Sequence, residues 1–582
     1  PAQASGQLGL TQPVITHDTP GRRANTPAPN ASSVAPASVA AAVPTKRATP
    51  GRTPSSTGAA PTLGGSPDAS PGRTSVTRFL IGGPGDDSVD CVIATENGDL
   101  LIAGVVAAAG NLPQAASMHQ PLGPLDGTDL PFLARISGDL QTLHWVSALP
   151  GGSLKAQQLA LGPDGAIFLG GSRGKNLHDL AAKAGRQVDA NWDRSSIAIV
   201  KFASDGSQVD WISPGGPNQK NSKVTGLVVD EQGRASFLAH PDGRGKAAYC
   251  LRLQPNGDHF ADWDTAGWAI SLHHKEKQLL EPGQFGAFYQ TVNHTDLDGP
   301  EGWREIHFKL YSIRQTGQVL LLDDGGVVLA GTLAYDFKEE GKKWFPAFDY
   351  FLARYDATGK LLWSTNLYAD GDSVHTPDQK PQCLSIDTAT GDLLVGVKQH
   401  GSNQYRLAGE LKGDTGNMLI SWIGRVDLAT GALKHGWYWH VQKYPGSVKY
   451  DQRGMPTHGW PSLAGNRMTG LANDAEGRVW FAGGAPHESY TSADAYAPWP
   501  ADRRDGQPYL AALDPSFKGM VYATTFAGTS GGGAAEALAM LDTGIALAGR
   551  FTGTGFSDGT VPSFGHADSQ DQDGCLILAR WP

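Results

Sequence analysis

Side chains that could perform chemistry are few in this sequence, and their spacing matches no known catalytic pattern. The four cysteines, Cys91, Cys250, Cys383 and Cys575, are far apart in the sequence. Covalent haem attachment needs C-x-x-C-H, and zinc sites need closely spaced Cys or His ligands, so neither is indicated. The glycine-rich segment around Gly528 lacks the strand-to-helix context of a nucleophile elbow or a phosphate loop. We therefore predict no catalytic residue, and we expect the cysteines to be buried thiols rather than a disulfide framework.

One acidic segment has the residue types that bind hard cations. The run A-D-S-Q-D-Q-D-G at 567–574 offers the carboxylates of Asp568, Asp571 and Asp573. It resembles part of a calcium-binding loop but lacks the glutamate that closes such a loop twelve positions along. Calcium is the one cofactor for which the sequence offers ligands, and a solvated turn with no cofactor is the alternative.

Aromatic residues concentrate in two long insertions, at 264–315 and 397–463. Long insertions on a rigid scaffold are where binding tends to be located, and aromatic rings can stack on sugars or on a protein partner. Packing of these rings inside the fold is the alternative. The rings that we predict to bind are Trp303, Trp437, Tyr438, Trp439 and Tyr444.

The elements that position these residues follow from an internal repeat. Seven copies occur of an apolar run, a turn rich in Asp, Asn and Gly, and a second apolar run ending in small residues. The copy at 159–171, L-A-L-G-P-D-G-A-I-F-L-G-G, is representative. Glycine is expected in each turn because hairpin turns favour a positive φ. The turn glycines are Gly98, Gly165, Gly233, Gly326, Gly391, Gly477 and Gly544.

Each hairpin is followed by a third apolar strand that carries one basic residue, as in F-L-A-R-I at 132–136. We expect this side chain to face solvent or to bridge to the turn aspartate of its own repeat, rather than to line a ring of positive charge. A fourth strand, often marked by Trp, completes the repeat. The sixth copy has Ala512 at the basic position. The other copies have Arg135, Lys201, Arg252, Arg354, Arg425 and Arg580.

Seven such units predict an all-β fold, a seven-bladed β-propeller, because a single four-stranded sheet cannot bury both of its faces. The seventh unit ends at Pro582, directly after its third strand. The segment S-V-T-R-F-L-I-G-G at 75–83 precedes the first unit, and we expect it to be the missing fourth strand. This pairing would close the ring and leave no strand edge unpaired. The predicted domains are an extended arm at 1–74 and the propeller at 75–582.

The units resemble the β-propeller repeat family found in secreted bacterial proteins. The segment A-R-Y-D-A-T-G-K-L-L-W at 353–363 is similar to the Trp-docking repeats of quinoprotein-type propellers. The resemblance covers about 75–582 and implies the fold rather than the function, since both families host many roles. Quinoprotein dehydrogenases typically use two adjacent cysteines, calcium and an aspartate base within eight blades. Here no two cysteines are adjacent and seven units are counted, so that activity is not expected.

Residues 1–74 differ from the rest in composition, being dominated by Pro, Ala, Ser, Thr and Gly. Such a segment cannot offset the entropy of ordering by itself, so we expect an extended linker or a docking arm. It carries six basic and two acidic residues, which suits docking on an acidic neighbour. Its one apolar stretch, L-G-L-T-Q-P-V-I-T, is the expected anchor, through Leu8, Val14 and Ile15.

The net charge of −10 argues against nucleic acid as the main partner. The sequence has no run of 18 apolar residues, so no membrane-spanning segment is expected, and we expect the chain to begin after processing. We predict a secreted, periplasmic or cell-surface protein. Its predicted function is that of a non-enzymatic binding or structural subunit with protein partners. A carbohydrate-binding or carbohydrate-active propeller, with glycans as ligands, is the alternative.

Overall fold

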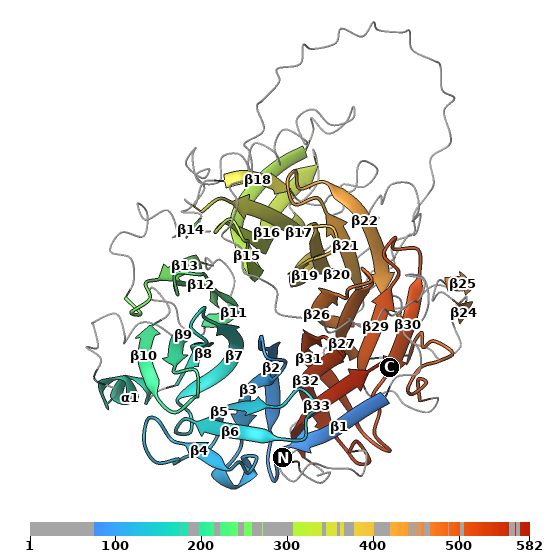
Figure 1. Cartoon of the computed structure of the whole chain (residues 1–582). Coiled ribbons are helices and arrows are strands. Elements are labelled where there is room, and N and C mark those ends of the chain that lie inside the picture. Colours follow the sequence, from blue (N-terminus) through green and yellow to red (C-terminus); the bar gives the residue numbers. More distant parts are fainter. Residues whose placement is uncertain are drawn as a thin grey trace, which may run out of the picture. The chain divides into compact units, whose positions relative to one another are not determined.

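In the computed structural model the chain folds as a ring of seven β-sheets (Figure 1). The helical elements among the described residues are α1 (Leu177–Lys183) and the 3-10 turn η1 (Ala109–Asn111). The predicted arm, 1–74, lies outside the described residues. The structure describes residues 75–581 except for 175, 184, 186–196, 215–221, 242–248, 259–269, 272–305, 340–344, 358–360, 366–377, 401–418, 440, 443–448, 451, 453–455, 459–465, 487, 501–505, 558–564 and 566–570.

Each blade has four main strands in the order innermost, second, third and outermost. Blade 1 adds β4 (Ser117–His119), which pairs in parallel with its outermost strand. Blade 1 consists of β2 (Ser88–Ala94), β3 (Leu100–Val106), β5 (Leu130–Ile136) and β6 (Leu143–Ala148), and blade 2 of β7 (Leu154–Leu161), β8 (Ile167–Arg173), β9 (Ile197–Phe202) and β10 (Val209–Pro214). Blade 3 consists of β11 (Ser222–Val229), β12 (Ala235–Pro241), β13 (Tyr249–Leu253) and β14 (Ile270–Ser271). Blade 4 consists of β15 (Ile306–Leu321), β16 (Val327–Glu339), β17 (Phe345–Tyr355) and β18 (Leu361–Thr365).

The remaining blades repeat this arrangement, and two short ribbons lie in the connections. The ribbons are β23 (Val441–Gln442) with β28 (Glu488–Ser489) and β24 (Lys449–Tyr450) with β25 (Pro456–His458). Blade 5 consists of β19 (Asp378–Ile386), β20 (Leu393–His400), β21 (Leu419–Val426) and β22 (Leu433–Trp439). Blade 6 consists of β26 (Arg467–Asn473), β27 (Val479–Ala485), β29 (Gln507–Leu513) and β30 (Met520–Thr525). Blade 7 consists of β31 (Gly532–Leu541), β32 (Gly544–Thr552), β33 (Gln572–Arg580) and β1 (Ser75–Ile81).

The first strand in the described part of the chain closes the ring, as predicted. β1 pairs antiparallel with β33 along its whole length and is the outermost strand of blade 7 (Figure 1). Its last three side chains, Phe79, Leu80 and Ile81, are at most 1% exposed. The two ends of the propeller are therefore held together by a backbone ladder and by buried apolar side chains.

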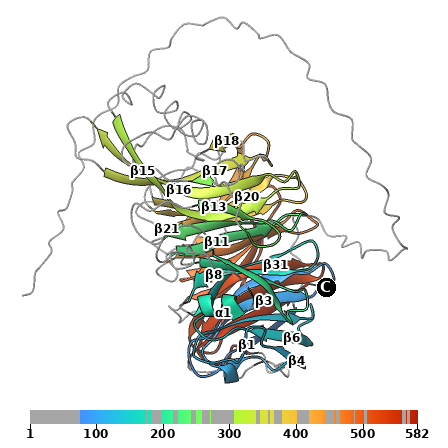
Figure 2. The same cartoon turned by 90° about the vertical axis from the view of Figure 1, so that its left-hand side faces the viewer.

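Antiparallel order gives the ring two different faces. The turns between first and second strands and between third and fourth strands all lie on one face, which we call the turn face. The connections between second and third strands, and those between blades, lie on the other, which we call the loop face. Among the described strands, β15 is the longest innermost strand and β16 the longest second strand, and both extend beyond the neighbouring blades (Figure 2). Variable connections are thus concentrated on the loop face.

Five of the seven predicted turn glycines have a positive φ, from 74° to 81°. In blade 4 the residue with positive φ is Gly325 rather than Gly326. Gly326 is needed for a different reason, because a Cβ there would lie 2.4 Å from the carbonyl oxygen of Tyr355. In blade 7 the turn is tighter, so Gly544 already pairs with Leu541 in the ladder and has no positive φ. The prediction was wrong at these two positions because the hairpins differ in loop length.

Two outer-strand tryptophans, Trp211 and Trp363, dock on the next blade. The indole Nε1 of Trp211 donates a hydrogen bond of 2.9 Å to the carbonyl oxygen of Pro255. Its ring lies against Gly257, which has a φ of 85°. Trp363 lies against Gly431 of blade 5 in the same way. The glycine therefore serves both the turn and the close approach of the indole.

We expect Gly257→Ala to destabilise the propeller by about 2–4 kcal/mol, because it combines left-handed strain with a steric overlap. A Cβ at this position would lie 2.6 Å from the Trp211 ring. Gly98→Ala is the matched control, since Gly98 has a similar φ of 81° and no heavy atom within 4 Å of its Cβ position. Denaturant midpoints measure both variants. Equal losses in the two variants would show that the Trp docking contributes nothing.

The described cysteines are buried free thiols, as predicted: Cys91, Cys383 and Cys575. Burial raises the pKa of each thiol well above its ordinary value, so these groups stay protonated and act as small apolar side chains. The side chain of Cys250 lies outside the described residues. Among the described helices, none is long and apolar enough to cross a membrane.

Candidate functional site

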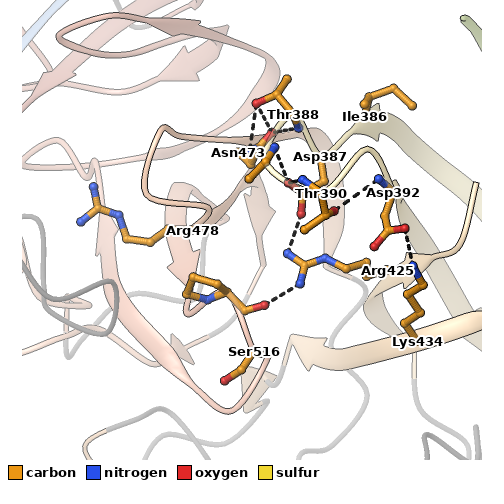
Figure 3. Close-up of polar contacts among 12 residues, drawn as sticks. Ile386, Asp387, Thr388, Thr390, Asp392, Arg425, Lys434, Asn473, Arg478 and Ser516 are labelled. Atoms are coloured by element: carbon orange, nitrogen blue, oxygen red, sulfur yellow. Dashed lines mark hydrogen bonds and ion pairs between the residues drawn. The ribbon is translucent and has the colours of Figure 1, made fainter. Parts of the chain in front are cut away.

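In blades 1 to 5 the basic residue of the third strand bridges to the turn aspartate of its own blade. Arg425 Nη2 lies 2.5 Å from Asp387 Oδ2, and both side chains are buried (Figure 3). Arg425 Nη1 also donates to the carbonyl oxygen of Pro515 in blade 6, at 2.6 Å. Arg354 makes the equivalent pair with Asp324, at 2.7 Å. These groups hold neighbouring blades in register, so we assign them to the scaffold and not to a binding site.

Blade 6 keeps this arrangement although it has Ala512 at the basic position. Arg478, from the turn itself, places its Nε 2.6 Å from Asp474 Oδ2. Blade 3 contains the same turn pair, with Arg234 Nε 2.6 Å from Asp230 Oδ2. The turn arginine therefore replaces the missing third-strand arginine as the partner of the buried carboxylate.

A polar bulge interrupts the innermost strand of every blade at the same level. A register shift lies between Val89 and Cys91 in β2, and β15 has one between Arg314 and Gln318. The innermost strand pairs on one side only, so its other edge faces the ring axis (Figure 1). A bulged residue leaves the ladder and redirects its side chain. In blades 1, 2, 3, 5, 6 and 7 the bulged residues are, in that order, Asp90, Gln157, Thr225, Gln382, Thr469 and Glu536.

Bulged side chains connect neighbouring blades. Gln157 Oε1 accepts a hydrogen bond of 2.9 Å from the backbone N–H of Val224 in blade 3. Thr469 Oγ1 donates one of 2.8 Å to the carbonyl oxygen of Ala535 in blade 7. These bonds satisfy backbone groups that the bulges leave outside the ladders. The axial region is therefore a fixed polar frame.

Basic residues occupy one position of this frame, two residues before the bulged residue. Four blades in which the side chain is described have an exposed Lys or Arg there. In blade 4 the equivalent ladder position, opposite Thr332, is Arg314. Blades 1 and 7 have Ser88 and Ala534 instead. We call the five basic residues the basic ring: Lys155, Lys223, Arg314, Lys380 and Arg467.

Further charges lie beside the basic ring. Lys398 pairs with Lys380 across the ladder of blade 5. Burial, then the nearby charges of Lys380 and Arg467, lower the pKa of Lys398, so three cations from two blades converge here. On blade 7, Glu536 pairs with Arg467 at 2.9 Å and with Arg550 at 2.8 Å. Carboxylates thus offset part of the positive charge beside blades 7 and 1, where Asp90 interacts with Arg550 and Lys155, whereas Lys380 and Lys398 place uncompensated cations in blade 5.

Three members of the basic ring, Lys155, Lys223 and Lys380, form no hydrogen bond or ion pair with the described residues. Their side chains are exposed at the loop-face ends of β7, β11 and β19. An exposed lysine is flexible and strongly hydrated, and it costs little to reorient toward an arriving anion. This part of the frame is therefore the candidate functional site.

The predicted aromatic residues that are described do not form a binding surface. Trp437, Tyr438 and Trp439 are at most 6% exposed. The Trp439 ring stacks on Tyr509 at 5.0 Å and meets Phe481 edge-on at 5.3 Å, between blades 5 and 6. All three rings pack inside the fold, because successive residues of β22 face opposite sides of the sheet: Trp437 and Trp439 pack between blades 5 and 6, and Tyr438 packs between blades 4 and 5. The other predicted binding residues, Trp303, Tyr444, Leu8, Val14 and Ile15, lie outside the described residues.

The predicted calcium ligands are placed only in part. Asp571 is exposed, and its Oδ2 accepts a 3.0 Å hydrogen bond from the backbone of Gly85. Asp573 is buried, and Asp568 lies outside the described residues. Within the described part of the chain, no group of three or more His, Cys, Asp or Glu side chains is arranged to hold a metal ion. Calcium binding stays a prediction.

A buried polar cluster that the sequence did not indicate lies at the junction of blades 7 and 1. Asp87 accepts hydrogen bonds from the backbone N–H groups of Gly83, at 2.7 Å, and Ala107, at 2.6 Å. The Asn111 amide donates to both of its oxygens, at 3.2 and 3.3 Å. This carboxylate orders the connection between β1 and β2, which is a structural role.

No family model matches the sequence, and no curated protein matches it. Among solved structures, the fold is similar to the quinohemoprotein alcohol dehydrogenase ADHIIG of Pseudomonas putida HK5. The identity is 10% over 88% of this chain and 77% of that chain, with a TM-score of 0.41. A polysaccharide lyase, the PL25 ulvan lyase, is 9% identical over 85% of this chain and 96% of that chain, with a TM-score of 0.38. These likenesses concern the propeller fold alone, and no activity or residue role follows from them.

Proposed function

We propose that this chain is a non-enzymatic binding and structural subunit of an extracellular or cell-envelope assembly. In this proposal the propeller is the scaffold, and residues 1–74 dock onto partner chains. The observation that carries the proposal is the axial frame on the loop face. Its blades are held in register by hydrogen bonds such as those of Gln157 and Thr469. It presents three exposed side chains, Lys155, Lys223 and Lys380, that form no hydrogen bond or ion pair with the described residues. A rigid frame of this kind is preorganised for binding.

Deletion of residues 1–73 tests the docking part of the proposal. We expect the shortened chain to keep its unfolding midpoint, because β1 begins at Ser75 and is retained. We expect it to be lost from the assembly, which is measured by purifying particles from the native source and determining their mass. A full-length variant with Leu8, Val14 and Ile15 changed to Ser is the matched control for chain length, and it should assemble poorly as well. Assembly of the shortened chain at the normal level would refute the docking role.

A further inference from the structure

We propose that the basic ring binds a ligand with several carboxylate groups, supplied either by a small polycarboxylate or by the uronic-acid residues of an acidic saccharide. The inference rests on the proposed function, since it names the ligand class of the same scaffold. The site consists of the loop-face ends of the innermost strands in blades 2, 3, 5 and 6. Its anion-binding groups are the ammonium groups of Lys155, Lys223 and Lys380.

The first observation that supports an anion site is the repetition of a positively charged residue at one ladder position. Five consecutive blades carry Lys or Arg two residues before the bulge or at the equivalent ladder position. Lys and Arg together make up 47 of the 582 residues, so random placement would rarely fill five of seven equivalent positions. The chain as a whole has a net charge of −10, so this positive set runs against the overall charge. The folding of the blades does not require it, because blades 1 and 7 have Ser88 and Ala534 there.

The uneven compensation of charge around the ring is the second support. Glu536 pairs with both Arg467 and Arg550. The Asp90 carboxylate of blade 1 interacts with Arg550 and Lys155, so the positive charge beside blades 7 and 1 is offset in part. In blade 5 the ladder pairs Lys380 with Lys398, and no ion pair to a described carboxylate offsets Lys380. Like charges placed together repel, and a bound anion relieves this cost. The pKa of Lys398, lowered by burial and by its cationic neighbours, agrees with such an arrangement.

The residue types and their distribution favour separate carboxylates over a single phosphate. The cations stand on different strands of different blades, so one compact anion could meet only part of the set. Lysine presents a point charge without the fork that selects bidentate phosphate or carboxylate geometry. A ligand that carries several separate anionic groups could contact several of these cations at once.

Isothermal titration calorimetry on the full chain at low ionic strength tests the proposal. The probes are citrate, a short oligogalacturonate and a neutral galactose oligosaccharide of similar length. We expect citrate, the oligogalacturonate or both to bind, with an affinity that falls as salt is added, and the neutral oligosaccharide not to bind. Binding of the oligogalacturonate alone would assign the carboxylates to a saccharide, and binding of citrate, with or without the oligogalacturonate, would assign them to a small polycarboxylate. Failure of both acids to bind would overturn the proposal.

The variant Lys155→Gln, Lys223→Gln, Lys380→Gln locates the site. We expect about a 10- to 100-fold loss of affinity, because hydrogen bonds to charged groups are removed from an exposed site. The matched control, Lys183→Gln, Lys434→Gln, Lys518→Gln, removes the same charge away from the basic ring and should bind as the wild type does. Equal loss in both variants would overturn the location. Unfolding midpoints establish that both variants are folded, and the single variant Lys380→Gln should show a smaller loss in the same direction.

The same titration separates this inference from the proposed function. Mass spectrometry of the oligogalacturonate after incubation shows whether the probe stays intact. A cleaved probe would overturn the non-enzymatic function while leaving the anion site in place. Intact probe and normal assembly together with absent binding would overturn the anion site alone.

Discussion

Removal of residues 1–82 is expected to destroy the cooperative unfolding of the propeller and to give an aggregating protein. Blade 7 would lose its outermost strand, and β33 would expose an unpaired edge to solvent. The buried side chains of Phe79, Leu80 and Ile81 would be lost as well, at roughly 5–9 kcal/mol in total. This loss is comparable to the whole stability of a typical domain. Thermal unfolding followed by circular dichroism and light scattering measures the outcome.

The control for this deletion is the chain that lacks residues 1–73, which keeps β1. Two point variants refine the comparison. Phe79→Ala should cost about 3–5 kcal/mol, because its side chain is fully buried between blades 7 and 1. Ser75→Ala, at the exposed start of the same strand, should leave the midpoint unchanged. If the two deletions unfolded at the same midpoint, closure by β1 would contribute nothing to the stability of the ring.

Closure could be predicted from the sequence because the repeat supplies a complete inventory of strands. The seventh unit lacks a fourth strand, and 75–81 is a strand without a blade, so each defect accounts for the other. The details of the turns could not be predicted equally well. Gly325 and Gly544 depend on the loop length of a single hairpin, which changes the conformation of the glycine without changing the repeat.

The missing arginine of blade 6 left a signal that could have been found. The turn D-A-E-G-R at 474–478 matches the turn D-E-Q-G-R at 230–234, and in both the final arginine pairs with the first aspartate. The copy with Ala512 is therefore not defective. Asp474 Oδ2 also accepts a 2.7 Å hydrogen bond from the Trp480 indole, so this buried carboxylate oxygen has two hydrogen-bond donors within its own blade. Comparing turns with turns, rather than third strands alone, would have predicted this replacement.

The basic ring also has a regular spacing in the sequence. Lys155, Lys223 and Arg467 each stand ten residues before the turn glycine of their blade. This regularity gains a meaning only when the innermost strand is known to have a free edge and a bulge, which are properties of the assembled ring. The packing of the aromatic residues could not be predicted from the sequence, because it depends on the neighbouring blade. The alternation of Trp437 and Trp439 predicts a common face, but the neighbouring blade that covers this face is absent from any local pattern.

Arg425→Ala is expected to lower the free energy of unfolding by about 3–5 kcal/mol, because it removes one partner of a buried ion pair. Asp387 is fully buried, and its Oδ2 accepts from Arg425 at 2.5 Å. The variant also loses the hydrogen bond to the Pro515 carbonyl and the contact of the guanidinium with the Phe517 ring, 4.9 Å from its centroid. The loss therefore affects both blade 5 and its junction with blade 6, and denaturant unfolding measures it.

A double variant separates the ion pair from the packing. Asp387→Asn combined with Arg425→Met removes both charges while keeping much of the volume, and it should recover part of the stability, because no uncompensated charge remains buried. Lys434→Ala is the surface comparison: its side chain is 39% exposed and pairs with Asp392 at 2.6 Å and with Asp427 at 2.9 Å, so its loss should cost at most about 1 kcal/mol. If Arg425→Ala behaved like Lys434→Ala, the buried pair would be no more than a surface contact. The Asp–Arg repeat would then have no role in holding the blades in register.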